Sequence, residues 1–125
     1  MEIAEQASGT VAVLALSGHL LEDGTCPPGV VSERVERLTA GGKTLVVLDL
    51  AGLDGIDAMG IGEIAGAYRR ARSHGADLKL INPRPRVDRL LSVTKLRTMI
   101  DVWDLPEVEP RPPAYHPAAP GALRV

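Results

Sequence analysis

The sequence is poor in the side chains that bind nucleic acids. Its 125 residues include no Phe, one Trp and two Tyr, so it lacks the aromatic platforms on which single-stranded nucleic acids stack. Lys and Arg number 14 against 16 Asp and Glu, a net charge of −2 with His neutral, which argues against binding through bulk positive charge. We therefore expect no nucleic-acid partner and a core of aliphatic residues and alanine.

Cysteine and long apolar runs are also scarce. Cys26 is the single cysteine and can form no disulfide within the chain, which fits a reducing compartment. No His stands beside it in a local catalytic motif, so we interpret Cys26 as a small apolar residue and not a nucleophile. No apolar run reaches the roughly 20 residues of a membrane-spanning helix, and the start MEIAEQ is acidic. The expectation is a cytoplasmic protein without direct membrane insertion.

Composition changes sharply at Pro106. Residues 106–125 hold six of the ten prolines and only scattered apolar residues. Proline locks φ and removes an amide donor, so this stretch is ill suited to a packed core. We predict one domain over residues 1–105 and a Pro-rich, flexible C-terminal tail over 106–125, with an ordered arm packed along the domain as the alternative.

Within residues 1–105, short apolar runs alternate with segments of helical period. Strands are predicted at 2–6, 10–16, 44–50, 76–81 and 99–103, and helices at about 31–40, 58–74 and 83–96. Gly41-Gly42 and Gly75 are the expected helix stops. The order β-β-α-β-α-β-α-β predicts an α/β single domain, a mixed sheet with a leading antiparallel hairpin and parallel strands packed by helices.

The glycines near position 60 resemble part of a nucleotide motif. Gly60, Gly62 and Ala65 fit G-x-G-x-x-A at a helix start, where dinucleotide sites bring a pyrophosphate to free amides. However, Gly60 lies ten residues beyond Leu50, where the preceding strand is predicted to end, and the acidic residue about twenty positions further on is missing. Small residues that let the helix approach the sheet are the favoured interpretation, and a small nucleotide- or ligand-binding domain is the alternative.

Two aspartates resemble the phosphoacceptor stretch of a receiver domain. Asp49-Leu50 ends an apolar strand and Asp54-Gly55 follows. A receiver holds magnesium with an acidic cluster after its first strand, and here that strand runs into Ser17-Gly18-His19-Leu20. A hard cation would find too few oxygen ligands. We therefore interpret Asp49 as a strand-end carboxylate that binds loop amides, and we predict no metal and no cofactor.

The start of the helix near residue 58 is the best candidate site. Asp57 is well placed as its N-cap, and Glu63 adds negative charge early in the helix. The apolar side chains of Ala58, Met59 and Ile61 follow the cap directly. A rigid, exposed helix end with apolar residues suits docking of another protein.

At these residues the chain resembles the STAS domain family of anti-sigma factor antagonists and sulfate transporter tails. The family pattern is a strand ending in D-L, then I-D-S-x-G-L-G opening a helix, then G-x-x-L-x-L and N-P. The corresponding stretches here are LVVLDL at 45–50, IDAMGIG at 56–62, GADLKL at 75–80 and Asn82-Pro83. The resemblance extends over about residues 2–105. Lys95 departs from it, because the family often has T-G-L where this chain has Thr94-Lys95-Leu96.

The resemblance implies a switch that this chain lacks. In the family, a kinase-type anti-sigma partner phosphorylates the Ser after the motif Asp, and the unmodified form binds the anti-sigma factor. That position is Ala58, which has no hydroxyl, so the phosphoacceptor is degenerate. Thr25 and Thr94 are the most plausible relocated acceptors.

The resemblance therefore predicts a non-catalytic regulator. Its expected partner is an anti-sigma factor or a related kinase-like protein, bound through residues Asp57, Ala58, Met59, Gly60, Ile61 and Gly62. The alternative is an adaptor subunit of a transporter or multi-protein signalling assembly. With either function, a second copy of the chain is a further candidate partner, giving a homo-oligomer.

Overall fold

The computed structural model describes residues 1–22 and 26–105. The elements follow the predicted order and form a five-stranded sheet with strand order β1-β2-β3-β4-β5. Their bounds are β1 Glu2–Ser8, β2 Val11–Leu20, α1 Ser32–Ala40, β3 Leu45–Ile56, α2 Ala58–Ser73, β4 Asp77–Ile81, α3 Pro85–Val93, the 3-10 turn η1 Leu96–Thr98 and β5 Asp101–Trp103. The β1–β2 pair is antiparallel and the other pairs are parallel, so the predicted mixed α/β sheet with a leading hairpin is confirmed.

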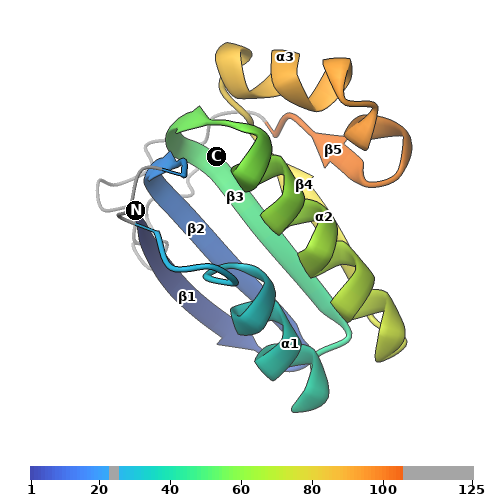
Figure 1. Cartoon of the computed structure of the whole chain (residues 1–125). Helices are drawn as coiled ribbons and strands as arrows, with labels where there is room; N and C mark the ends of the chain where they lie inside the picture. The colour runs from blue at the N-terminus through green and yellow to red at the C-terminus, as the bar shows by residue number, and fades with distance from the viewer. Residues whose placement is uncertain (23–25, 106–125) are drawn as a thin grey trace, which may run out of the picture.

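The core lies between one face of the sheet and the helices. In Figure 1, α1 and α2 lie side by side across the same face of the sheet, and α3 adds Val87 and Leu91 to the same apolar cluster. Alternate residues of the strands point into it, for example Leu14 on β2 and Leu48 on β3, both fully buried. Every buried apolar side chain in the described ranges is Leu, Ile, Val or Ala, as the near-absence of aromatics requires.

Two predicted boundaries are wrong, and they fail together. The first long strand does not end at residue 16, and the following strand does not end at residue 50. Instead β2 runs to Leu20 and β3 runs to Ile56, and the two extensions pair with each other through register shifts. Gly52 permits this, because a Cβ there would lie 3.1 Å from the Leu16 carbonyl oxygen. A glycine that reads as a break in sequence is here a point of close contact between strands.

The third helix is also shorter than predicted. It ends at Val93 rather than at residue 96, because Lys95 takes a left-handed conformation with φ +67°. A non-glycine residue with this φ costs roughly 1 kcal/mol or more. The family that the chain resembles often has glycine at this position, in the pattern T-G-L. Glycine adopts a positive φ without steric cost, which explains that preference.

Candidate functional site

Asp57 organises the start of α2 by accepting three backbone hydrogen bonds. It is extended (φ −130°, ψ −167°), and its Oδ1 accepts from the amides of Met59 at 3.0 Å and Gly60 at 3.1 Å. Its Oδ2 accepts from the amide of Glu22 at 2.9 Å, so one carboxylate ties the end of β2 to the start of α2. The Glu22 amide, followed by those of Gly60 and Met59, holds the pKa of Asp57 below its ordinary value, with desolvation opposing them.

The residues after this cap differ in how far they reach solvent. Ala58 and Gly62 are exposed and stand one helical turn apart on the same side of α2. Met59 and Ile61 are half-buried, and Gly60 is buried. The surface that α2 presents at its first turn is therefore small and apolar, with a methyl group at position 58 and no side chain at position 62.

Gly60 and Gly62 owe their places to different surroundings. A Cβ on Gly60 would lie 2.5 Å from both the Leu20 carbonyl oxygen and Ile56 Cγ1, so α2 lies against the sheet only because this residue has no side chain. A Cβ on Gly62 would meet nothing within 4 Å. Packing against the sheet thus explains the glycine at position 60, and no bound nucleotide is needed to explain it. The packing of the fold does not require a glycine at position 62.

Glu63 has a role that the sequence analysis missed. It lies early in α2, as predicted, just beyond the first turn of the helix. Its carboxylate accepts from the backbone amides of Gly29 at 2.7 Å, Val31 at 3.0 Å and Ser32 at 3.2 Å. The residue at the α1 N-cap, Val31, has no side-chain acceptor, so α1 is capped by a carboxylate from α2. The sequence holds one indication of this contact: Val31 stands where a helix usually has Ser, Thr, Asp or Asn as its N-cap, so the cap must come from another part of the chain.

The two carboxylates together fix the end of β2 and the start of α1 against α2. Asp57 binds the first at Glu22 and Glu63 binds the second at 29–32. On the other side, Arg84 at the start of α3 donates from Nε to the Ala51 carbonyl oxygen at 2.7 Å and pairs with Asp54 at 3.2 Å. These contacts place the starts of α2 and α3 at the carboxyl edge of the parallel strands.

The other residues that the sequence singled out do not lie at the start of α2. Asp49 lies within β3, not at its end, and is 5% exposed, and its Oδ1 accepts from the Ala51 amide at 3.0 Å. The Cys26 thiol donates a hydrogen bond from Sγ to the His19 carbonyl oxygen at 3.4 Å. The Thr94 hydroxyl donates to the Leu90 carbonyl oxygen within α3 at 2.7 Å. Thr25 and the segment 106–125 lie outside the described residues.

Residues 1–22 and 26–105 contain neither of two further features. Within them, no group of three or more His, Cys, Asp or Glu side chains is arranged to hold a metal ion. Over the same ranges, no helix combines the length and apolar character that crossing a membrane demands.

The fold and this helix start define a small α/β module with a capped, solvent-facing turn at the edge of its sheet. The model of the STAS domain matches residues 29–108, more than half of the chain. The chain belongs to the STAS domain family.

Solved structures share the fold at low sequence identity. The anti-sigma factor antagonist SpoIIAA in its unphosphorylated form superposes with a TM-score of 0.70 at 18% identity, covering 85% of this chain and 90% of that one. An anti-sigma factor antagonist from Mycobacterium paratuberculosis gives a TM-score of 0.69 at 17% identity, covering 99% of this chain and 94% of that one. The phosphorylated form of the Bacillus SpoIIAA gives 0.60 at 19% identity, covering 85% and 93%.

A curated relative matches a shorter stretch. A protein of Thermotoga neapolitana, provisionally named an anti-sigma factor antagonist and TM1081 homolog, is 31% identical over 63 residues. The stretch is 50% of this chain and 56% of that protein, so the chain spans little more than half the length of the curated relative it matches.

Proposed function

We propose that this chain is a non-catalytic regulator that works as an anti-sigma factor antagonist in the cytoplasm. Its partner is an anti-sigma factor or a related kinase-like protein, which docks on residues 57–62. The observation that carries the proposal is the exposed, apolar first turn of α2, held in place by Asp57. The proposal is supported by the match to the STAS domain family and by the curated relative, which is provisionally named an anti-sigma factor antagonist.

Regulation at this turn differs from that implied by the family pattern. A phosphate adds about −1.5 to −2 charges, and a helix N-terminus tolerates such charge because its free amides and dipole are positive. A docked partner must desolvate that charge or meet it with its own, so phosphorylation would release it. Ala58 offers a methyl group and no acceptor oxygen. The chain is therefore held permanently in its binding form at this surface.

Binding of the purified anti-sigma factor to two variants and to the unaltered chain tests the docking surface. Ala58→Glu places a carboxylate on the exposed first turn, and we expect it to weaken binding by about tenfold or more. Ser92→Glu adds the same charge at an exposed position of α3 and should leave affinity unchanged. Equal affinities for Ala58→Glu and the unaltered chain would remove residues 57–62 from the interface. Co-purification with a membrane complex instead of a kinase-like protein would favour the adaptor alternative.

Incubation with the partner kinase and labelled ATP tests the missing acceptor. We expect label in Ala58→Ser and none in the unaltered chain. Asp57 is retained in both proteins, so the helix start is capped in each case. Equal labelling of the two would place the modification at another residue, and Thr94→Ala and Thr25→Ala would then locate it.

A further inference from the structure

β3 continues beyond the strand that pairs with it on one side. β4 pairs with β3 only as far as Asp49 and Ile81, whereas β3 runs on to Ile56. The chain leaves β4 at Asn82, which takes a left-handed conformation with φ +55°, one that asparagine tolerates better than most residues. Residues 50–56 therefore have β2 as their strand neighbour on one side, and no strand of residues 1–22 or 26–105 pairs with them on the other.

This extension of β3 is irregular where it lies beside β2. The register between the two strands shifts twice, and each time β3 has one residue more than β2. Such a β-bulge leaves a residue outside the ladder, so its backbone polar groups need other partners. Ala51 lies in the first bulge, between Asp49 and Gly52, and Asp54 is the extra residue of the second.

Arg84 binds at both bulges. Its Nε donates to the Ala51 carbonyl oxygen at 2.7 Å in the first bulge, and its Nη1 pairs with Asp54 Oδ1 at 3.2 Å in the second. The Ala51 amide donates to Asp49 Oδ1 at 3.0 Å, so charged side chains bind both backbone polar groups of Ala51. Because Arg84 directly precedes α3, its guanidinium occupies the side of β3 that β4 has left.

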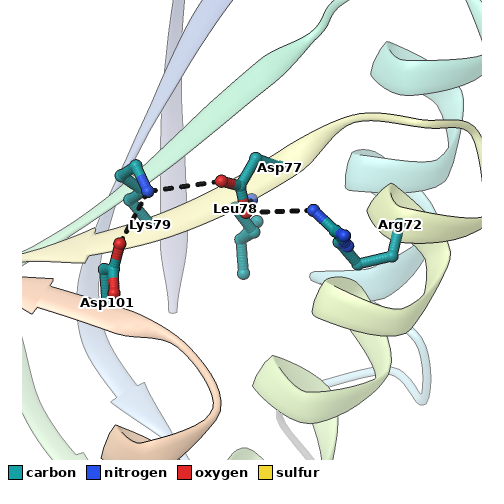
Figure 2. Close-up of polar contacts among 5 residues, drawn as sticks. All are labelled: Arg72, Asp77, Leu78, Lys79 and Asp101. Atoms are coloured by element: carbon teal, nitrogen blue, oxygen red, sulfur yellow. Dashed lines mark hydrogen bonds and ion pairs between the residues drawn. The ribbon is translucent and has the colours of Figure 1, made fainter.

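The ion pairs along β4 have a different setting. Figure 2 shows the Lys79 ammonium between Asp101 at 2.8 Å and Asp77 at 3.3 Å, with Arg72 of α2 at 3.9 Å from Asp77. Lys79 lies where β4 pairs with both β3 and β5, so backbone ladders already hold the strands together there. Exposed ion pairs in such a place contribute little. Arg84 differs, because it binds a backbone carbonyl at a part of β3 that has lost its strand neighbour on that side.

The proposed docking surface follows this extension directly. β3 ends one residue before Asp57, whose carboxylate accepts from the amides of Met59 and Gly60. A change in the path of residues 51–56 would therefore carry the cap away from the amides that it binds. A binding surface that is ordered for only part of the time loses apparent affinity in proportion, whereas a surface fixed beforehand avoids that cost.

We propose that Arg84 is a positioning residue for partner binding. By holding both bulges of β3, it keeps Asp57 and the turn at 57–62 in the conformation that the partner recognises. The guanidinium acts through β3 and does not itself need to touch the partner. This role rests on the function proposed for residues 57–62.

Amide hydrogen exchange of the free protein tests the first step. In Arg84→Gln we expect exchange at Met59 and Gly60 to quicken by about tenfold through local opening. The amides of the central strands should keep their protection, because the Arg84 side chain is 54% exposed and its loss does not open the core. Asp54→Asn removes only the contact at the second bulge and should give a smaller change in the same direction.

Binding of the purified anti-sigma factor tests the second step. Arg84→Gln should lower the affinity about fivefold, mainly through slower association, because the competent turn is populated less. Arg84→Lys should recover part of the loss, since its ammonium can donate to the same carbonyl or carboxylate. Arg86→Gln is the matched control: it removes the same charge at an exposed position of α3 and should bind as the unaltered chain does.

The remaining outcomes each contradict this role. Unchanged exchange at Met59 and Gly60 in Arg84→Gln would overturn it and leave the proposed function intact. Quickened exchange with unchanged affinity would also overturn it, provided that Ala58→Glu still weakens binding. An equal loss of affinity in Arg86→Gln would assign the effect to charge alone. If neither Arg84→Gln nor Ala58→Glu changes the affinity, the proposed function fails, and the role of Arg84 in binding fails with it.

Discussion

The two helices that lie side by side on the sheet begin in different ways. α2 starts at a cap supplied by the residue directly before it, Asp57. α1 starts at Val31 and takes its cap from Glu63, about thirty residues further along the chain. The start of α2 is therefore specified locally, and the start of α1 is specified only when α2 is in place. A substitution that displaces α2 should therefore destabilise the starts of both helices. A substitution in α1 should destabilise α1 alone.

Gly60→Ala should have the largest effect, because it disturbs the starts of both helices. The added Cβ would lie 2.5 Å from the Leu20 carbonyl oxygen, so α2 must move away from the sheet, at a cost of about 2 to 3 kcal/mol in the free energy of unfolding. Urea denaturation measures that loss. Amide hydrogen exchange should quicken in both α1 and α2, because Glu63 moves with α2. Exchange confined to α2 would show that the two starts are independent.

Glu63→Ala should have the next largest effect. It leaves the amides of Gly29, Val31 and Ser32 without their acceptor, a loss of about 2 kcal/mol. Exchange should quicken at these amides while those of Met59 and Gly60 keep their protection. Glu63→Gln retains a carbonyl oxygen and should lose less stability. Equal loss of protection at Met59 and Gly60 would contradict the one-way dependence.

Asp57→Asn should have a smaller effect that appears mainly in its pH dependence. Asn caps helices about as well as Asp, but it does not titrate, and its amide nitrogen cannot accept from the Glu22 amide as Oδ2 does. The folded-state pKa of Asp57 lies below its ordinary value of 3.8, so the stability contributed by the carboxylate is complete above that value. It is lost as pH falls through the lower, folded-state pKa. Thermal unfolding should show the unaltered protein losing its advantage over Asp57→Asn below about pH 4. A constant difference across that range would contradict the assignment.

Gly62→Ala should be the mildest change and of opposite sign. Nothing lies within 4 Å of the added methyl group, and alanine favours a helix over glycine by up to about 1 kcal/mol. We expect a slightly higher melting temperature. Under the proposed function the methyl group lies within the docking surface, so affinity for the partner should fall while stability rises. Unchanged affinity alongside the gain in stability would show that no partner approaches position 62.

Patterns among neighbouring residues predicted most of the fold. They also predicted one of the two helix caps at the candidate site, the one made by Asp57. Helix and strand periodicity gave the element order, and the motif around Asp57 identified the start of α2, because both depend on neighbours in sequence. The paired extensions of β2 and β3 escaped prediction. Gly18 and Gly52 both lie beyond the predicted strand ends. The structure pairs the two strands there, with Gly18 at φ +94° and Gly52 in close contact with β2, and neither feature follows from neighbours in sequence.

The other half of the site could not be predicted for a related reason. Glu63 reads as an ordinary helix acid until the turn at 29–32 is known to lie beside it. Nothing within a few residues of either group indicates their contact, since it is created by the packing of α1 on α2. Sequence reasoning identified the cap that is made locally and missed the cap that is made between helices.

The strand order has a consequence for synthesis. Each strand in the series β1 to β5 lies beside the one that precedes it in the chain. As the protein leaves the ribosome from its N-terminus, every newly emerged strand can join the growing edge of those already formed. No strand has to be inserted between two others, so the nascent sheet extends in a single direction from the first hairpin.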